Sequence, residues 1–168
     1  MAISADQVKE LREQSGAGVM DCKRALVETN GDLQRAMEVL RQQGLAQASK
    51  RAGREASQGI VEAYVHGGGR IGVLVEVNCE TDYVARTEDV RTLAHDLAMQ
   101  IAATNPPSVG ELEGEPAPAS ASLDEVPLLQ QPFIKDAKRT VADLVRDTAA
   151  KTRENVVVRR FVRYELGV

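Results

Sequence analysis

The sequence has no tryptophan, and its only aromatic residues are three tyrosines and two phenylalanines. A hydrophobic core must therefore be built mainly from aliphatic side chains, which favours helices and small sheets. The 43% apolar and 27% charged fractions are typical of a folded, soluble protein. A chain of 168 residues is long enough for one ordinary domain or two small ones.

Cysteines and long hydrophobic runs are also scarce. Cys22 and Cys79 are too few for a disulfide scaffold or for a zinc site, which needs about four ligands. We interpret both as reduced, small apolar residues. No apolar run approaches the roughly 18 residues that span a bilayer, and the first twenty residues do not resemble a signal peptide. We therefore expect a cytoplasmic protein without membrane contact.

The sequence has no overall excess of basic residues. Residues 1–58 carry 9 Lys or Arg against 8 Asp or Glu, whereas residues 59–168 carry 12 against 17. A general nucleic-acid-binding protein needs positive charge to neutralise phosphates. The composition therefore argues against that class.

Three short helices are expected at the N-terminus. Ser4 and Gln7 have the spacing of a capping box, which predicts the start of the first helix. Apolar residues recur at positions i, i+3, i+4 and i+7 in the second and third helices, and Gly44 is expected to end the third. We predict a three-helix bundle over residues 1–45, followed by a partly helical linker over residues 46–58.

Residues 59–168 are predicted to form an α+β domain, in which helices cover one face of a three-stranded antiparallel sheet. The strands are expected at 59–66, 71–79 and 156–166, and the helices between Thr87 and Asn105 and around 141–149. Residues 105–127 are rich in Pro, Ala, Ser and Glu and lack apolar periodicity. They predict an exposed or disordered loop.

No catalytic or nucleotide-binding motif is evident. Residues 67–72 fit the pattern G-x-G-x-x-G, but a Val-rich strand follows them instead of the helix that would hold a pyrophosphate. The phosphate-binding pattern G-x-x-x-x-G-K-[ST] does not occur. His66, Asp82 and His95 are the only candidates for acid–base chemistry, and no nucleophile accompanies them. We expect no enzymatic activity, no bound cofactor and no metal.

Two motifs have both a functional and a structural interpretation. The run from Arg159 to Tyr164 mixes basic and aromatic residues, with Arg159, Phe161 and Arg163 expected on one face of a strand. It suits either single-stranded RNA or arginine stems that cover a sheet. Met20 lies off the apolar stripe of its helix. It either contacts a partner or belongs to a helix that is buried on two sides.

A third motif is the turn Thr81-Asp82-Tyr83-Val84, which leaves a predicted buried strand. Thr81 or Asp82 could cap the following helical turn while Tyr83 packs beneath it. Alternatively, Tyr83 protrudes as an aromatic wedge. Spacing alone does not decide between the two.

Two long stretches of the sequence, LREQSGAGVMDCKRAL at residues 11–26 and EVNCETDYVAR at residues 76–86, resemble a known family. The family that they resemble is translation elongation factor Ts, whose members are guanine-nucleotide exchange factors of elongation factor Tu. Residues 64–75, 131–135 and 154–167 are also similar, so the resemblance covers most of the chain outside residues 105–127.

The resemblance implies a ubiquitin-associated-like module at the N-terminus and a core domain that grips the GTPase. In the family, a Thr-Asp-Phe-Val turn wedges against the nucleotide-binding domain and disturbs its Mg²⁺ site. The N-terminal module docks on another helix of that domain, and a hairpin residue makes a further contact. The residues implied here are Thr81, Asp82, Tyr83 and Val84 in the turn, Val19 and Met20 in the module, and His66 in the hairpin.

The sequence departs from the family pattern in three places. Ser15 replaces the usual Thr, Tyr83 replaces the usual Phe, and residues 105–127 stand where relatives carry a long helical segment. Longer members have two related core halves, whereas this chain has one, and a symmetric homodimer could restore the second.

The resemblance leads us to expect an exchange factor for elongation factor Tu that binds no nucleotide itself. The alternatives are an RNA-binding module that uses the strand of Arg159–Tyr164, or an adaptor that uses the N-terminal helices.

Overall fold

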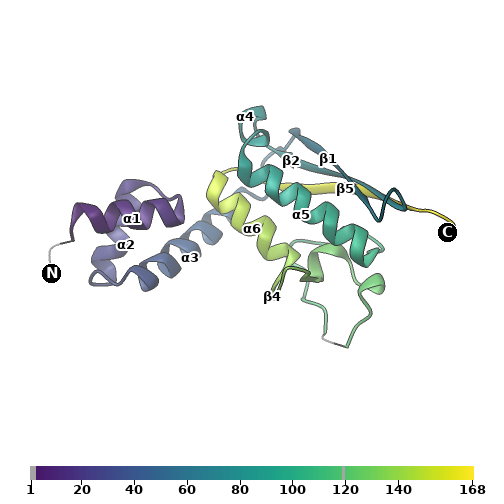
Figure 1. Cartoon of the computed structure of the whole chain (residues 1–168). Helices are drawn as coiled ribbons and strands as arrows, with labels where there is room; N and C mark the ends of the chain where they lie inside the picture. Colours follow the sequence, from purple (N-terminus) through teal and green to yellow (C-terminus); the bar gives the residue numbers. More distant parts are fainter. Residues whose placement is uncertain (1–2, 119) are drawn as a thin grey trace.

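The first part of the chain is a bundle of three helices. The structure is a computed structural model that describes residues 3–118 and 120–168 (Figure 1). The helices are α1 (Ala5–Ser15), α2 (Val19–Glu28) and α3 (Leu33–Arg51). The predicted capping box of Ser4 and Gln7 is confirmed. The small core of the bundle consists of Leu11, Cys22, Ala25, Leu26, Ala36 and Leu40.

Helix α3 is longer than the sequence suggested. The prediction that it ends at Gly44 is wrong, because the helix continues to Arg51 and takes up the first part of the predicted linker. Gly44 lies where α3 crosses α6 (Val141–Thr152), and a Cβ atom added to it would lie 3.1 Å from the Cβ of Ala150. A glycine inside a helix costs up to about 1 kcal/mol relative to alanine. In return for this cost, Gly44 allows α3 and α6 to pack closely against each other.

The second part of the chain contains the predicted three-stranded sheet. Its strands are β1 (Gln58–His66), β2 (Ile71–Cys79) and β5 (Val157–Glu165). Their order is β1-β2-β5, and both pairings are antiparallel. The α+β prediction is confirmed.

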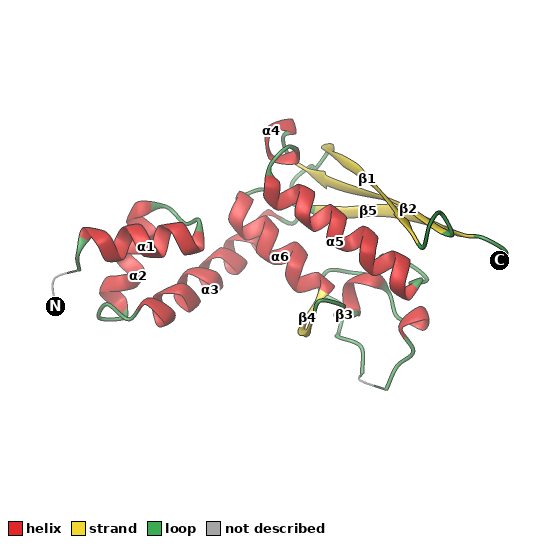
Figure 2. Cartoon of the chain, viewed as in Figure 1, coloured by secondary structure: helices red, strands yellow, loops and turns green. Residues whose placement is uncertain are grey.

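Helices α5 (Glu88–Thr104) and α6 lie together over one face of this sheet (Figure 2). The face carries the alternate residues Val73, Val75 and Val77 of β2, which are buried. They join the apolar residues of both helices in one core cluster. The opposite face of the sheet is not covered by any element of the described chain (Figures 1 and 2).

A β-bulge changes the predicted alternation of the last strand. Val158 pairs with Val77 and Arg160 with Glu76, so that Arg159 is left without a partner in the register. The prediction that Arg159 shares a face with Phe161 and Arg163 is therefore wrong, since the extra residue moves it to the outer face.

The Pro- and Ser-rich segment is an irregular loop, but it is not exposed throughout. Val109 and Leu112 pack against the main core cluster, and Val126 is buried. The short helices η1 (Leu123–Glu125) and η2 (Leu128–Gln130) and the small strands β3 (Pro132–Phe133) and β4 (Asp136–Thr140) lead into α6. Composition alone did not show that a few apolar residues fix this loop.

Buried glutamines hold the end of the loop. The Gln131 side chain is fully buried, and its Oε1 accepts hydrogen bonds from Gln100 Nε2 and Thr104 Oγ1 at 2.9 and 2.8 Å. Its Nε2 donates to the carbonyls of Leu123 and Val126. Each polar atom of this side chain therefore has a partner, as burial requires.

The capping box of Thr140 and Asp143 at the start of α6 leads to a pH prediction. Burial by itself raises the pKa of the Asp143 carboxyl, but hydrogen bonds from Thr140 and the charge of Arg146 outweigh it and hold that pKa below its ordinary value. The stabilisation is therefore present above the unfolded pKa of about 3.9 and is lost as the pH falls through the folded pKa.

We expect Asp143→Asn to lower the free energy of unfolding at neutral pH by about 1 kcal/mol, and to flatten its decline below about pH 4. Urea denaturation of both proteins at a series of pH values measures this. If the free energy of unfolding of the variant declined with falling pH as steeply as that of the unchanged protein, the assignment of this pH dependence to Asp143 would be contradicted.

Candidate partner-binding site

The predicted wedge turn forms a short helix directly after the central strand. Helix α4 (Asp82–Ala85) stands at the end of the core where β2 finishes (Figure 1). Thr81 is its N-cap residue, and its hydroxyl accepts a hydrogen bond from the Val84 amide at 3.3 Å. The capping role expected of Thr81 is confirmed.

The side chains of α4 divide into exposed and buried ones. Tyr83 is 78% exposed, so it does not pack beneath the turn, and that interpretation is wrong. Val84 and Ala85 belong to the main core cluster and anchor the helix. Asp82 is exposed and pairs with Arg86. The turn therefore exposes an acid and an aromatic ring, whereas Val84 is buried.

Glu154 holds this turn in place, although it lies 73 residues further along the chain. Its carboxylate accepts hydrogen bonds from the Thr81 hydroxyl at 2.7 Å and from the backbone amides of Glu80 and Thr81 at 3.0 Å each. No local pattern pointed to this residue, because a contact across such a separation has no periodic signature.

The thiol of Cys79 also supports the turn. It is buried and donates to the carbonyl oxygen of Thr81 at 3.1 Å. Burial raises the pKa of the Cys79 thiol, and the nearby carboxylate of Glu154 raises it further. The group therefore stays protonated at neutral pH and remains a donor.

The predicted contacts of the N-terminal module lie at the start of α2. Val19 and Met20 are 49% and 66% exposed. The interpretation that Met20 belongs to a helix buried on two sides is therefore wrong. Val19 also lines a hollow of about 640 Å³ between α1 and α2, together with Val8 and Ile3. An exposed apolar rim beside an open hollow is typical of a surface that binds another helix.

His66 lies at the hairpin end of β1, away from α4. Its Nδ1 is 2.9 Å from the Tyr64 hydroxyl, and the two rings stack with centroids 5.9 Å apart. Tyr64 also meets His95 edge to face. His66 and Asp82 are at opposite ends of the hairpin, because Gln58, not His66, pairs with Cys79.

The arginines of β5 are engaged within the fold. Arg160 pairs with Glu76 at 2.8 Å, and Arg163 pairs with Glu165 at 2.7 Å and donates to the Ala102 carbonyl. Arg159 donates to Asn78. All three arginines are thus engaged by groups of the chain itself, two of them by carboxylates, which favours the structural interpretation of this strand over an RNA platform.

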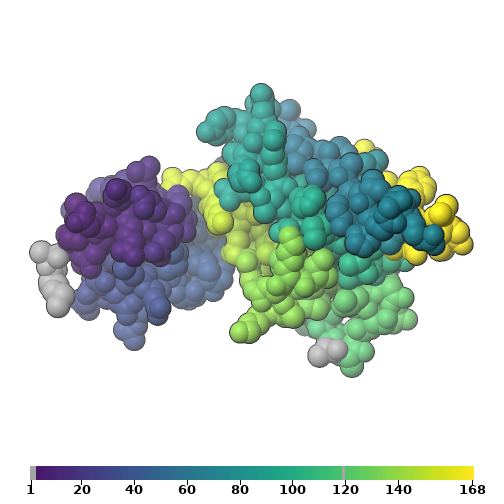
Figure 3. Space-filling model, viewed as in Figure 1, coloured from purple at the N-terminus to yellow at the C-terminus, as the bar shows by residue number. Residues whose placement is uncertain are grey.

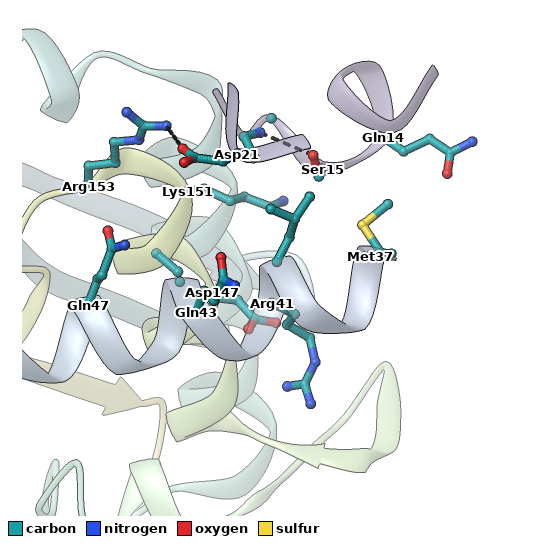
Figure 4. Close-up of a pocket in the computed structure, with 15 residues that line it drawn as sticks. Gln14, Ser15, Asp21, Met37, Arg41, Gln43, Gln47, Asp147, Lys151 and Arg153 are labelled. Carbon is teal, nitrogen blue, oxygen red and sulfur yellow. Dashed lines mark hydrogen bonds and ion pairs between the residues drawn. The ribbon is translucent and has the colours of Figure 1, made fainter. Parts of the chain in front are cut away.

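The bundle and the core meet between α3 and α6. Arg153 at the end of α6 points toward Asp21 of α2, with 3.6 Å between their charged groups (Figure 4). A cavity of about 220 Å³, lined by both apolar and charged residues, lies beside this pair. In the space-filling view this junction is the narrow part of the molecule (Figure 3). The crossing of α3 with α6 and this ion pair both contribute to the connection between the two parts.

Within residues 3–118 and 120–168, no three His, Cys, Asp or Glu side chains are grouped so that they could hold a metal ion. None of the helices described is both long and apolar enough to cross a membrane.

Sequence comparisons identify the family. A sequence profile of the family described as elongation factor Ts matches residues 4–115, which is more than half of the chain. The chain belongs to the elongation factor Ts family. Similar relatives, all named elongation factor Ts, cover nearly the whole of it.

Three of these relatives show the extent of the similarity. The protein of Moorella thermoacetica is 52% identical over 194 aligned positions, which cover 98% of this chain and 96% of the relative. That of Carboxydothermus hydrogenoformans is 50% identical, with 98% and 89% covered. That of Coprothermobacter proteolyticus is 46% identical, with 99% and 100% covered.

For this member of the elongation factor Ts family, the predicted contacts lie at three separate places. Tyr83 and Asp82 are on α4, Val19 and Met20 are on the bundle, and His66 is at the hairpin (Figure 1). The fold does not gather them into a pocket.

Proposed function

We propose that this chain is a guanine-nucleotide exchange factor for elongation factor Tu, and that Asp82 and Tyr83 on α4 act as the wedge that promotes GDP release. The observation that carries the proposal is the exposure of Tyr83, an aromatic side chain 78% open on a helix whose backbone is fixed from below. Aromatic side chains of this kind dominate the binding energy of protein interfaces.

The mechanism needs no covalent chemistry in this chain. Mg²⁺ bridges the nucleotide phosphates and demands near-octahedral coordination, so a small displacement of the groups around it loosens the nucleotide. Coupling is reciprocal, so the factor weakens GDP binding by the same ratio as GDP weakens binding of the factor. We propose that the chain acts in the cytoplasm, without a cofactor of its own.

Stopped-flow release of a fluorescent GDP from elongation factor Tu tests the proposal. The chain is expected to accelerate release in a concentration-dependent, saturable manner. If release is unchanged at every concentration, the chain is not an exchange factor for this GTPase, and the adaptor alternative gains support.

We propose that the exposed start of α2 contributes to the affinity for elongation factor Tu, and that it takes no part in the exchange step itself. We expect Met20→Ala to raise the concentration of factor needed for half-maximal release by about tenfold, the usual cost of truncating an interface anchor. The maximal release rate is expected to stay the same, because α4 is untouched. Leu166→Ala is the matched control, because Leu166 is as exposed as Met20, at 66%, and lies just after β5, away from the bundle. An equal effect of both variants would rule out a specific contact.

We also propose that a second copy of this chain covers the outer face of the sheet and supplies a second core half. Support comes from the apolar side chains that remain exposed on this face, which are Val61, Val65, Leu74, Val162 and Tyr164. A symmetric pair would bury the same patch on both copies.

Sedimentation equilibrium is expected to show a dimer for the unchanged chain and a monomer for Leu74→Glu. Val27→Glu is the control, because Val27 is exposed on the bundle. A monomeric unchanged chain at all concentrations would refute the dimer.

A further inference from the structure

Three consecutive residues at the corner between α6 and β5 reach three different parts of the molecule. Arg153 has a φ of +60°, which ends α6 and turns the chain back. Its side chain pairs with Asp21 of the bundle. The next residue, Glu154, binds the turn before α4, and Asn155 Nδ2 donates to carbonyl oxygens of residues 52 and 54, just after α3. This corner joins the bundle, the segment after α3 and the wedge.

Glu154 makes the most specific of these contacts. Its Oε2 accepts from the two consecutive amides of Glu80 and Thr81, and its Oε1 accepts from the Thr81 hydroxyl. In the reverse direction, Glu80 Oε1 accepts from the Asn155 amide at 2.7 Å. The loop before α4 and the corner after α6 are therefore joined by four hydrogen bonds that involve carboxylates.

These hydrogen bonds also orient the cap of α4. Because the Thr81 hydroxyl directs its proton at Glu154, a lone pair of the same oxygen is available to the Val84 amide. Hydrogen bonds to a charged acceptor are stronger than those between neutral groups. Glu154 thus fixes the direction in which α4 leaves the sheet, and with it the direction of Tyr83.

We propose that Glu154 is a positioning residue for nucleotide exchange, acting through Thr81 to hold the α4 wedge at the angle that displaces GDP. The inference rests on the proposed function. Glu154 itself need not touch the partner. Its removal leaves the exposed side chains Asp82 and Tyr83 present but not fixed in direction.

Glu154→Gln is the variant that tests this inference. The amide keeps the size of the side chain, but it cannot accept from the two backbone amides on one side and from the Thr81 hydroxyl on the other. We expect the maximal rate of GDP release to fall by about tenfold. The concentration for half-maximal release is expected to change much less, because the contacting side chains remain.

Two comparisons separate positioning from a general loss of stability. In a double-mutant cycle, Glu154→Gln and Thr81→Val are expected to be non-additive, because both break the same contact. Asp143→Asn, at the other end of α6, is the control that lowers stability without touching α4, and its release rate is expected to match that of the unchanged chain. Amide hydrogen exchange in Glu154→Gln is expected to accelerate at residues 80–84 only.

Each result decides the matter. If Glu154→Gln promotes GDP release at the rate of the unchanged chain while substitution of Asp82 and Tyr83 abolishes the acceleration, Glu154 is not a positioning residue. The proposal that α4 is the wedge then still stands. Additive effects of the two substitutions, or faster amide exchange throughout the protein, also overturn the positioning role of Glu154. If the unchanged chain does not accelerate release at all, the proposed function and this inference fall together.

Discussion

Replacing Asp82 and Tyr83 together by alanine is expected to reduce the acceleration of GDP release by at least about thirtyfold, the effect of losing one interface hot spot of 2 kcal/mol or more. Both side chains are exposed, and the helix that carries them is anchored by Val84 and Ala85 in the core. The melting temperature is therefore expected to stay close to that of the unchanged protein. Stopped-flow release and thermal unfolding measure the two quantities.

Two single substitutions sharpen this test. Tyr83→Phe restores the residue usual in the family and removes only a hydroxyl, so it is expected to keep most of the activity. Ile134→Ala removes an apolar side chain that is 43% exposed in the turn between β3 and β4, far from α4 (Figure 1). This variant is expected to promote GDP release from elongation factor Tu at the normal rate. A double variant as active as Ile134→Ala would show that α4 is not the wedge.

Much of the fold could be predicted because its signals are local. The capping box at Ser4, the alternation from Val73 to Val77 and the helical spacing of α5 each depend on residues a few positions apart. Gly44 misled the prediction, because a glycine that ends a helix and one that admits a neighbouring helix look the same in sequence. Only α6, about one hundred residues away, distinguishes them.

The bulge at Arg159 and the fixed loop were missed for a related reason. A bulge depends on the pairing of two strands that are remote in sequence, so the spacing within β5 alone could not reveal it. The loop over residues 105–127 is fixed by a few apolar contacts and by Gln131, which composition does not detect. The composition of the loop reflects its many residues that face water, and it does not reveal the few that face the core.

The candidate site could be predicted in part. Family resemblance pointed to the turn, but the exposure of Tyr83 and the burial of Val84 required the packing of α4 against the core. Glu154 could not be inferred from spacing, because its partner Thr81 lies 73 residues earlier in the chain. Exposed contacts are carried by short motifs, whereas the residues that hold them in place are distributed along the chain.

Gly59→Ala is expected to destabilise the protein by about 3 kcal/mol or more, at the upper end of what overpacking costs. Gly59 has a φ of +150°, and a Cβ atom there would lie 2.1 Å from the carbonyl oxygen of Val77 and 2.7 Å from the Cα of Asn78. Neither atom belongs to a flexible side chain, so β1 and β2 must separate locally. Chemical denaturation measures the loss.

Gly72→Ala is the matched control within the same hairpin. Gly72 lies in β2, has no unusual φ, and a Cβ atom there would meet nothing within 4 Å. The free energy of unfolding of the Gly72→Ala variant is expected to differ from that of the unchanged protein by less than about 1 kcal/mol. If Gly59→Ala were as mild, the two strands would not approach as closely as described.

The position of Gly59 also makes this substitution relevant to function. Gly59 pairs with Asn78, next to Cys79, whose thiol holds the carbonyl of Thr81. Strands forced apart there would move the start of α4 before the rest of the sheet unfolds. We therefore expect the surviving folded fraction of Gly59→Ala to promote GDP release from elongation factor Tu more slowly than its concentration accounts for, whereas Gly72→Ala promotes it at the normal rate. Equal rates per folded molecule in both variants would show that the wedge is insensitive to the geometry of the strand beneath it.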